Sequence, residues 1–317
     1  MFVHEDRDWK QLLEIIAAAN NRDLGMLEKD YWVTHSLWAL QAQGFELWFK
    51  GGTALSKGFS LIERFSEDLD LRIDAGQVIL PELRLSWKNE KAGVVERDRW
   101  FEALTASLRI PGCEATRNAL GSDDRVRSAW IEARYPALYA HTLPSSMRPF
   151  VLLEVGRARV LPFVERSLSS WVHDHLQEQG QLSDFFDNRP QAIRCVHPWV
   201  TCLEKLEAIS RRFSIPGRSA ADFVRHYEDV VHILAARRSL PPLSMTFAEL
   251  LRELAREDHK KMPLPDHPAF HPDETSRWQE VQQAWQAIQP MFWGARIPLV
   301  EACEIIRSFL EELREIQ

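Results

Sequence analysis

The stretch that most constrains the fold of this chain covers residues 48–74 and reads WFKGGTALSKGFSLIERFSEDLDLRID. Residues 45–50 are apolar and aromatic, which predicts a β-strand. The Gly51-Gly52 dipeptide predicts a tight turn, because glycine adopts backbone angles that other residues avoid. A short helix is predicted over 54–63 and a second strand over 68–73. We therefore expect a strand, a glycine turn, a helix and a second strand in quick succession.

The glycine turn has the features of an anion-binding loop. Gly51 and Gly52 allow close backbone approach, and Thr53 can cap the helix that follows. The N–H groups of such a turn and of the first helical turn would face an anion such as phosphate. A strand–helix turn with no ligand has the same local sequence. Two common phosphate motifs, GxxxxGK[ST] and GxGxxG, are absent.

Two carboxylates, Asp68 and Asp70, stand at alternate positions in the second predicted strand. On a strand their side chains share one face and lie about 6–7 Å apart along the chain. Such a pair can bind a hydrated Mg²⁺, which prefers oxygen ligands and keeps water molecules for substrate phosphates. A solvated acid pair is the alternative, since Asp-x-Asp is common. The turn and the pair together, joined by one helix, indicate a site for a nucleotide and a divalent metal.

Composition limits the classes of protein to which the chain can belong. Its 317 residues, of which 45% are hydrophobic and 27% charged, predict a globular protein of two lobes. A net charge of −7 argues against indiscriminate coating of nucleic acid, although a local basic groove is compatible with it. The 4 cysteines form no CxxC pair, the N-terminus lacks an apolar signal core, and no run of about 18 apolar residues occurs. We therefore expect a cytoplasmic protein with no membrane segment.

Hydrophobic patterns divide the chain into a mixed half and a helical half. In the first half, further strands are predicted over 113–118, 126–135 and 149–155, and helices over 8–20, 24–43 and 94–109, with an irregular segment over 75–92. In the second half, helices are predicted over 165–179, 198–213, 219–238, 246–257, 273–289 and 298–316. We therefore expect an α+β fold with a sheet lobe over 1–160 and a helical lobe over 161–317.

The sequence KGGTALSKGF followed by RFSEDLDL resembles the AbiEii/AbiGii toxin family, the nucleotidyltransferase-like toxins of type IV toxin–antitoxin systems. Its wider relatives are the DNA polymerase β-like nucleotidyltransferases. The resemblance covers about residues 24–235 and continues in segments at 27–40, 151–159, 201–213 and 218–234. It implies an α+β fold in which a nucleotidyltransferase-like mixed β-sheet lobe with flanking helices precedes a C-terminal helical lobe.

The resemblance also implies roles for residues of the sheet lobe. Gly51–Thr53 match the family's phosphate-binding turn, and Lys57 matches the basic residue one helical turn later. Asp68 and Asp70 match the metal-binding pair. Glu154 falls on the later strand where nucleotidyltransferases carry a third carboxylate, which would be a third metal ligand or a base acting on the attacking hydroxyl.

Further roles are implied in the helical half. Lys205 matches the lysine of the family's EKL helix and would reach a nucleotide phosphate. Arg212 shares the Lys205 face of that helix and would add a second cation for the nucleotide, whereas Arg211 is offset. Asp229 matches the acid of the family's fourth motif and would orient Lys205, or the base or ribose of the nucleotide. Arg225, one helical turn earlier, offers Asp229 a simple i, i+4 ion pair instead.

Together these matches imply an Mg²⁺- or Mn²⁺-dependent nucleotidyltransferase toxin. An acceptor hydroxyl would attack the α-phosphate of a nucleoside triphosphate and release pyrophosphate. The resemblance points to the 3′ end of tRNA as acceptor, to a cognate antitoxin that is a DNA-binding repressor, and to a role in phage defence. Binding of RNA would need a basic cleft, for which the sequence offers Lys50, Lys57, Arg64, Arg72, Arg157, Arg159, Lys205 and Arg211.

Two other functions stay open from the sequence. A nucleotide sensor without transfer activity would use the same glycine turn, although sensing does not require both Asp68 and Asp70. A nucleotidyltransferase with a protein or small-molecule acceptor would keep the whole site. Lys29 and Asp30 are expected to support the site from the N-terminal helix, and a modification of Ser66 would inhibit by adding charge beside the metal pair.

Overall fold

The computed structural model describes residues 1–66, 68–74, 91–144, 147–257 and 260–316. Packing divides the chain into two compact units. The first unit contains Met1–Gly58, Glu67–Val160 and Glu165–Cys195. The second unit contains Phe59–Ser66, Leu161–Val164 and Val196–Gln317. The functional division that we predict at residue 160 stays a prediction, because these units are defined by packing alone.

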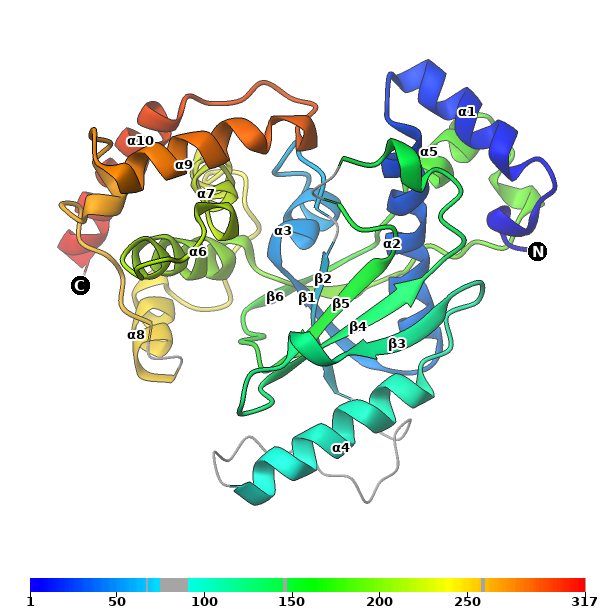
Figure 1. Cartoon of the computed structure of the whole chain (residues 1–317), viewed down its shortest axis with the longest axis horizontal. Helices are drawn as coiled ribbons and strands as arrows, with labels where there is room; N and C mark the ends of the chain where they lie inside the picture. The colour runs from blue at the N-terminus through cyan, green and yellow to red at the C-terminus, as the bar shows by residue number, and fades with distance from the viewer. Residues whose placement is uncertain (67, 75–90, 145–146, 258–259, 317) are drawn as a thin grey trace. The chain divides into compact units, whose positions relative to one another are not determined.

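A mixed seven-stranded sheet is the centre of the first unit (Figure 1). Its strands are β1 (Glu46–Lys50), β2 (Asp68–Asp74), β3 (Glu114–Asn118), β4 (Ser128–Arg134), β5 (Val151–Gly156), β6 (Phe163–Arg166) and β7 (Ile193–Val196), in the order β3-β4-β5-β2-β1-β7-β6. Strand β2 is antiparallel to β1 and parallel to β5, and β4 is antiparallel to both β3 and β5. The predicted α+β class is confirmed.

Side-chain alternation explains why the central strands form where they do. In β2 the residues Leu69, Leu71 and Ile73 are buried, whereas Asp68 and Asp70 between them are partly exposed. This period of two gives the sheet one apolar face and one polar face at β2. In β5 three consecutive residues at its start are buried, as expected for a strand covered on both faces.

The helices of the first unit pack on the sheet or on one another. They are α1 (Trp9–Asn20), α2 (Leu24–Ala42), α3 (Gly51–Thr53), α4 (Lys91–Ser107) and α5 (Trp171–Glu178). Helix α2 packs against β1 and β5 and also contacts α1 and α5, and it lies behind the sheet in Figure 1. Helix α4 packs against β3. Because α2 has protein on all sides, even charged residues in it are buried.

The three consecutive charged residues of α2 each have partners from distant parts of the first unit. Glu28 accepts hydrogen bonds from two backbone N–H groups, each at 3.0 Å. Lys29 donates to the carbonyl oxygen of Arg148 at 2.6 Å. Asp30 pairs with Lys57 at 2.6 Å and accepts from the N–H of Trp171 at 2.9 Å. These contacts satisfy buried charges that would otherwise destabilise the helix.

The helix predicted over 54–63 is right as far as Gly58, in π-helical form, and wrong over 59–63. After α3 the chain forms a π-helical turn over Ala54–Gly58 and then leaves helical geometry. Ser60 has a φ angle of +52°, in the left-handed region that a right-handed helix excludes. Residues 59–66 belong by packing to the second unit. The helix therefore ends at the residue where the chain passes from one unit to the other.

Tertiary hydrogen bonds explain this departure from helix. The N–H of Phe65 donates to the carbonyl oxygen of Met291 at 2.8 Å. The carbonyl oxygen of Glu63 accepts from the N–H of Trp293 at 3.1 Å. With the antiparallel bridge of Arg64 to Phe292, these bonds hold residues 63–65 in a strand-like pairing that a helix cannot include. Partners more than 200 residues away in the chain therefore outweigh the local helical preference.

The helix predicted over 165–179 is wrong in its first part, where residues form strand β6. Helix α5 begins only after Ser170, whose hydroxyl accepts a hydrogen bond from the N–H of His173 as an N-cap. The strands β6 and β7 were both missed by the sequence patterns. Each has four residues, too few for an alternating pattern to differ from a helical one.

The second unit is mainly helical. Its helices are α6 (Pro198–Phe213), α7 (Arg225–Ala235), α8 (Phe247–Glu257), α9 (Ser276–Ala287) and α10 (Leu299–Ile316). Helix α7 packs between α6 and α10.

Short 3₁₀ helices occur in both units. They are Val3–Glu5, Ala119–Gly121, Ala140–Thr142, Leu182–Asp184, Ala220–Asp222, Pro268–Phe270 and Gln289–Met291. The irregular segment predicted over 75–92 lies outside the described residues, except for its last two, which begin α4.

Among the residues that the structure describes, no helix is both long enough and apolar enough to cross a membrane.

A buried network of hydrogen bonds joins α2 to α5 in the first unit. His35 donates from Nε2 to the carbonyl oxygen of Pro111 at 2.9 Å, so its Nδ1 accepts from the Asn188 amide at 2.7 Å. The Asn188 carbonyl oxygen accepts from His173 Nε2 at 2.8 Å, and His173 Nδ1 accepts from Ser170 at 2.6 Å. Each imidazole is thus held as a neutral tautomer. Burial lowers the pKa of His35 to about 3, and burial also lowers the pKa of His173.

We predict that this network makes the first unit sensitive to acid. The pKa of His35 is lower in the folded protein than in the unfolded chain, so its stabilisation is complete above pH 6.5 and is lost as the pH falls towards about 3. The free energy of unfolding should fall by up to about 1.4 kcal/mol per pH unit for each such histidine. Denaturant titrations at several pH values between 7.5 and 5 measure this slope.

His35→Gln should reduce the pH slope of the unfolding free energy. The matched control is His271→Gln, at an exposed histidine, which should leave the slope unchanged. Equal slopes in the wild-type protein and in His35→Gln would contradict the prediction.

Candidate functional site

Three carboxylates lie on one face of the central sheet. Strands β2 and β5 are parallel, with Asp70 opposite Glu154 and Asp68 opposite Leu152. Directly paired residues point to the same face, so Asp68, Asp70 and Glu154 share the polar face. All three side chains are partly exposed, in contrast to the buried leucines between them. The register brings together two strands separated by about 80 residues of chain.

The glycine turn is fitted closely against this face. Gly51 has a φ angle of +78°, and a Cβ at this position would lie 1.8 Å from Oδ2 of Asp70. The hydroxyl of Thr53 donates to the backbone carbonyl of Asp68 at 2.6 Å. Two features favour glycine at position 51: its positive φ angle, and the Asp70 carboxylate, which occupies the space of a Cβ. The turn and the carboxylate pair, which the sequence suggested as two separate signals, form one structure.

Lys57 is held inside the first unit. It lies on the π-helical turn, where its ammonium pairs with Asp30 at 2.6 Å and donates to the carbonyl oxygen of Ser169 at 2.9 Å. Its side chain is 11% exposed. These contacts anchor the turn that follows Gly51-Gly52 to Asp30 of α2. The nucleotide-binding role of Lys57 stays a prediction.

Arg148 is a cation beside the carboxylates that the sequence patterns missed. Its guanidinium lies 3.8 Å from Oδ1 of Asp68 and 5.4 Å from the ring centre of Trp130. The backbone carbonyl of Arg148 accepts from the buried Lys29, as described above. Arg148 lies in an irregular segment 80 residues after Asp68, so no local pattern could have indicated it. It places a partly exposed positive charge next to the predicted metal pair.

The donor set suits a hard divalent cation, but only with additional ligands. Oxygen donors of the kind that Asp68 and Asp70 provide are the ligands that Mg²⁺ prefers. Among the described residues, however, no three His, Cys, Asp or Glu side chains converge into a ready metal site. A metal here would take its remaining ligands from water and phosphate, which is usual for Mg²⁺. The role of Glu154 as a third metal ligand stays a prediction.

Asp229 and Lys205 form a buried ion pair in the second unit. Lys205, on α6, approaches Oδ2 of Asp229, on α7, at 2.8 Å. Arg64 binds the same carboxylate with two hydrogen bonds, at 2.7 Å to Oδ1 and 2.8 Å to Oδ2. Burial alone would raise the pKa of Asp229, but the two cations hold the pKa well below its ordinary value. The pairing with Arg225 that the sequence also allowed is replaced by Arg64, 165 residues earlier.

His226 lies between Lys205 and Arg212. Its Nδ1 is 3.2 Å from Lys205 Nζ, and its Nε2 is 3.3 Å from Arg212 Nη1. Burial and the neighbouring cations lower the pKa of His226 well below its usual range. Burial also lowers the pKa of Lys205, although Asp229 opposes this effect. Arg212, predicted as a nucleotide ligand, further donates to the carbonyl oxygen of Asp222 at 2.5 Å.

The predicted site residues thus form two groups. The first unit brings together the glycine turn and the carboxylates, and the second unit brings together Lys205, Asp229 and Arg212. Each group is internally connected. The prediction that both groups act on one nucleotide stays a prediction.

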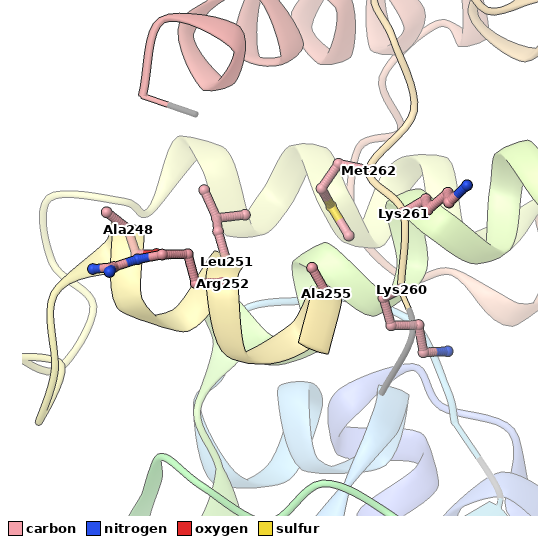
Figure 2. Close-up of a pocket in the computed structure, with 7 residues that line it drawn as sticks. All are labelled: Ala248, Leu251, Arg252, Ala255, Lys260, Lys261 and Met262. Atoms are coloured by element: carbon pink, nitrogen blue, oxygen red, sulfur yellow. The ribbon is translucent and has the colours of Figure 1, made fainter. Parts of the chain in front are cut away.

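A cavity of about 600 Å³ lies elsewhere in the second unit (Figure 2). It is lined by Ala248, Leu251, Arg252, Ala255, Lys260, Lys261 and Met262. Figure 2 shows the first four residues on α8 and the last three on the segment after it. None of the predicted site residues lines this cavity.

Comparison with known proteins finds one family. The family described as "nucleotidyl transferase AbiEii toxin, type IV TA system" matches residues 37–309. No curated protein matches the chain.

Three solved structures are similar to this chain. MenT4, a nucleotidyltransferase toxin from Mycobacterium tuberculosis H37Rv, is 15% identical, with 97% of each chain covered and a TM-score of 0.40. JHP933 from Helicobacter pylori is 14% identical, covering 92% of this chain and 95% of its own, with a TM-score of 0.39. An antigenic nucleotidyltransferase-like protein from Paracoccidioides brasiliensis is 13% identical, covering 88% and 93%, with a TM-score of 0.31. The family of this chain is assigned from the family match alone, and these distant structures carry no part of that argument.

We predict that Gly51→Ala weakens binding of a divalent metal at Asp70 by about tenfold or more, because the added methyl group displaces the carboxylate. Titration with Mn²⁺, followed by electron paramagnetic resonance, measures the affinity. Gly180→Ala is the matched control, since Gly180 has a φ angle of +70° and a Cβ there would meet nothing within 4 Å.

Both alanine variants carry a similar backbone cost of about 1–2 kcal/mol, and Gly51→Ala adds the displacement of the carboxylate, so its melting temperature should fall at least as far as that of Gly180→Ala. Only Gly51→Ala should lose metal affinity. Equal affinities in the two variants would show that Asp70 does not bind the metal.

Proposed function

We infer the reaction of this chain from its family: it belongs to the AbiEii nucleotidyl transferase toxins of type IV toxin–antitoxin systems and is a nucleotidyltransferase. The family implies a nucleoside triphosphate as substrate, a divalent metal and an antitoxin partner. We propose that this enzyme transfers a nucleoside monophosphate to the 3′ end of tRNA and that it depends on Mg²⁺, with Mn²⁺ as a substitute. The observation that supports the reaction best is the contact of Gly51 with Asp70, opposite Glu154.

The first unit supplies the groups that would act at the α-phosphate. Gly51, Gly52 and Thr53 would hold the triphosphate through backbone N–H groups at the start of α3. Asp68 and Asp70 would hold the metal, which supplies a Lewis acid for the phosphate oxygens. Glu154 would be a third ligand of the metal, or it would accept the proton of the attacking hydroxyl. The acceptor oxygen then bonds to the α-phosphorus as the bond to pyrophosphate breaks.

The second unit supplies positive charge for the nucleotide. We propose that Lys205 and Arg212 bind phosphate and that Asp229 orients Lys205. The buried contact of Lys205 with Asp229, at 2.8 Å, supports this assignment. An ammonium in a site of low dielectric attracts a phosphate more strongly than one in water does.

An aromatic side chain between cations supports RNA as the acceptor. Trp48, on β1, lies on the same face as Asp70, and its ring centre is 5.7 Å from the guanidinium of Arg72 and 4.9 Å from that of Arg194. Single-stranded RNA is commonly bound by cations along its backbone with aromatic rings for its bases. We further propose a cytoplasmic enzyme that acts in phage defence, with a DNA-binding repressor as antitoxin.

We predict that incubation with Mg²⁺, total cellular RNA and each labelled nucleoside triphosphate in turn labels tRNA at its 3′ end. Asp68→Asn and Asp70→Asn should each reduce the rate by at least about a hundredfold, because charge stabilisation of the transition state is lost. Asp74→Asn is the matched control, as an exposed aspartate at the end of the same strand. It should retain the wild-type rate within about twofold.

Other outcomes would revise the proposal. Label on proteins or small molecules, with none on RNA, would replace the acceptor. Tight binding of a nucleotide without any transfer would favour a sensor. Equal rates in Asp68→Asn and the wild-type protein would remove the metal role of the pair.

A further inference from the structure

Arg64 joins a short segment of the N-terminal half to the helices of the second unit. The segment Phe59–Ser66 belongs to the second unit, although the residues before and after it belong to the first. Arg64 forms an isolated antiparallel bridge with Phe292, and its side chain is 2% exposed. Arg64 stands four residues before Asp68 in the sequence. The segment that carries this buried cation therefore leads directly to the strand of the metal pair.

The contact of Arg64 with Asp229 has the strongest geometry available to this pair of residue types. Two parallel hydrogen bonds, of 2.7 and 2.8 Å, join the guanidinium to both carboxylate oxygens. A third N–H group of Arg64 donates to the carbonyl oxygen of Phe65 at 3.1 Å. The Asp229 side chain is fully buried. Both of its oxygens are therefore bound by the protein before any ligand arrives.

The charges of this cluster leave Lys205 available to an anion. Arg64 and Lys205 each carry a positive charge, and Asp229 carries one negative charge, so the three groups together are positive. Without Arg64, Asp229 and Lys205 would neutralise each other. Lys205 has three N–H donors, and its contacts with Asp229 and His226 occupy two of them among the described residues.

We propose that Arg64 is a positioning residue of the transfer reaction: it fixes Asp229 by both oxygens and so holds Lys205 in the orientation that a nucleotide phosphate requires. This inference rests on the proposed function, in which Lys205 binds that phosphate. Asp229 acts through Lys205 and does not itself touch the nucleotide. The geometry of the Arg64 guanidinium matters as well as its charge, because a lysine at this position could not bind both oxygens of Asp229 at once.

The rival explanation is a buried ion pair that serves stability alone. The second unit offers a matched example in Arg296 and Glu228, the residue next to Asp229 on α7. Arg296 pairs with Glu228 at 3.0 Å, and these side chains are also buried, at 8% and 1% exposed against 2% and 0% for Arg64 and Asp229. Removal of Arg296 takes the arginine from Glu228, and removal of Arg64 leaves Asp229 with Lys205 alone, so both changes weaken a buried ion pair and should destabilise the fold.

The test compares Arg64→Met with Arg296→Met in the full chain, at a temperature where circular dichroism shows both to be folded. KM for the nucleoside triphosphate and kcat are measured separately. Arg64→Met should raise KM by about tenfold or more, as expected for a misplaced charge on a phosphate. Arg296→Met should change KM by less than about twofold. Arg64→Lys, which keeps the charge but loses the paired hydrogen bonds, should give an intermediate KM and covers the case in which Arg64→Met does not fold.

A double substitution tests whether Arg64 acts through Asp229. If it does, Arg64→Met combined with Asp229→Asn should have the same KM as Asp229→Asn alone. If the two effects multiply, Arg64 acts on the nucleotide independently and the proposal is overturned. Equal KM values in the Arg64 and Arg296 variants, with an active wild-type enzyme, would also overturn it. A wild-type enzyme that neither binds nor transfers any nucleotide would instead reject the proposed function, and this inference with it.

Discussion

The close approach of Asp70 to Gly51 is the constraint on which the rest of the sheet face depends. A carboxylate oxygen occupies the space in which any other residue would place its Cβ, so the turn and the strand fit only with glycine there. Thr53 ties the same turn to the backbone beside Asp68. The parallel pairing of β2 with β5 then sets Glu154 opposite Asp70. Local backbone geometry and strand register thus converge on one small polar area of the sheet.

Several buried charges in both units are matched by partners from distant parts of the chain. Asp30 holds Lys57 behind the glycine turn, and Arg64 and Lys205 share Asp229. Such pairs cost desolvation energy, so they are weak evidence for stability by themselves. Their geometry is more informative, because each one fixes the direction of a side chain that the family resemblance connects with the nucleotide.

The sequence patterns predicted most strands and helices, and their errors have physical causes. The five strands from 45 to 155 were found because alternation or continuous apolar runs are local features. The helix over 54–63 ended early, at Gly58, because backbone groups near Phe65 bond to residues of the second unit. Strands β6 and β7 were missed because each is four residues long. Arg148 was missed because it lies in an irregular segment, where no periodicity marks a functional side chain.

The sequence by itself determined the chemistry of the candidate site: a glycine turn, two carboxylates at alternate positions, a later glutamate, and the order of segments that indicates the family. These features are local, and backbone propensity and residue type are enough to read them. Only the tertiary structure decided the partners. That Asp70 requires Gly51, that Glu154 lies opposite Asp70, and that Arg64 rather than Arg225 binds Asp229 are long-range contacts. They depend on sheet register and on packing, which no stretch of sequence specifies alone.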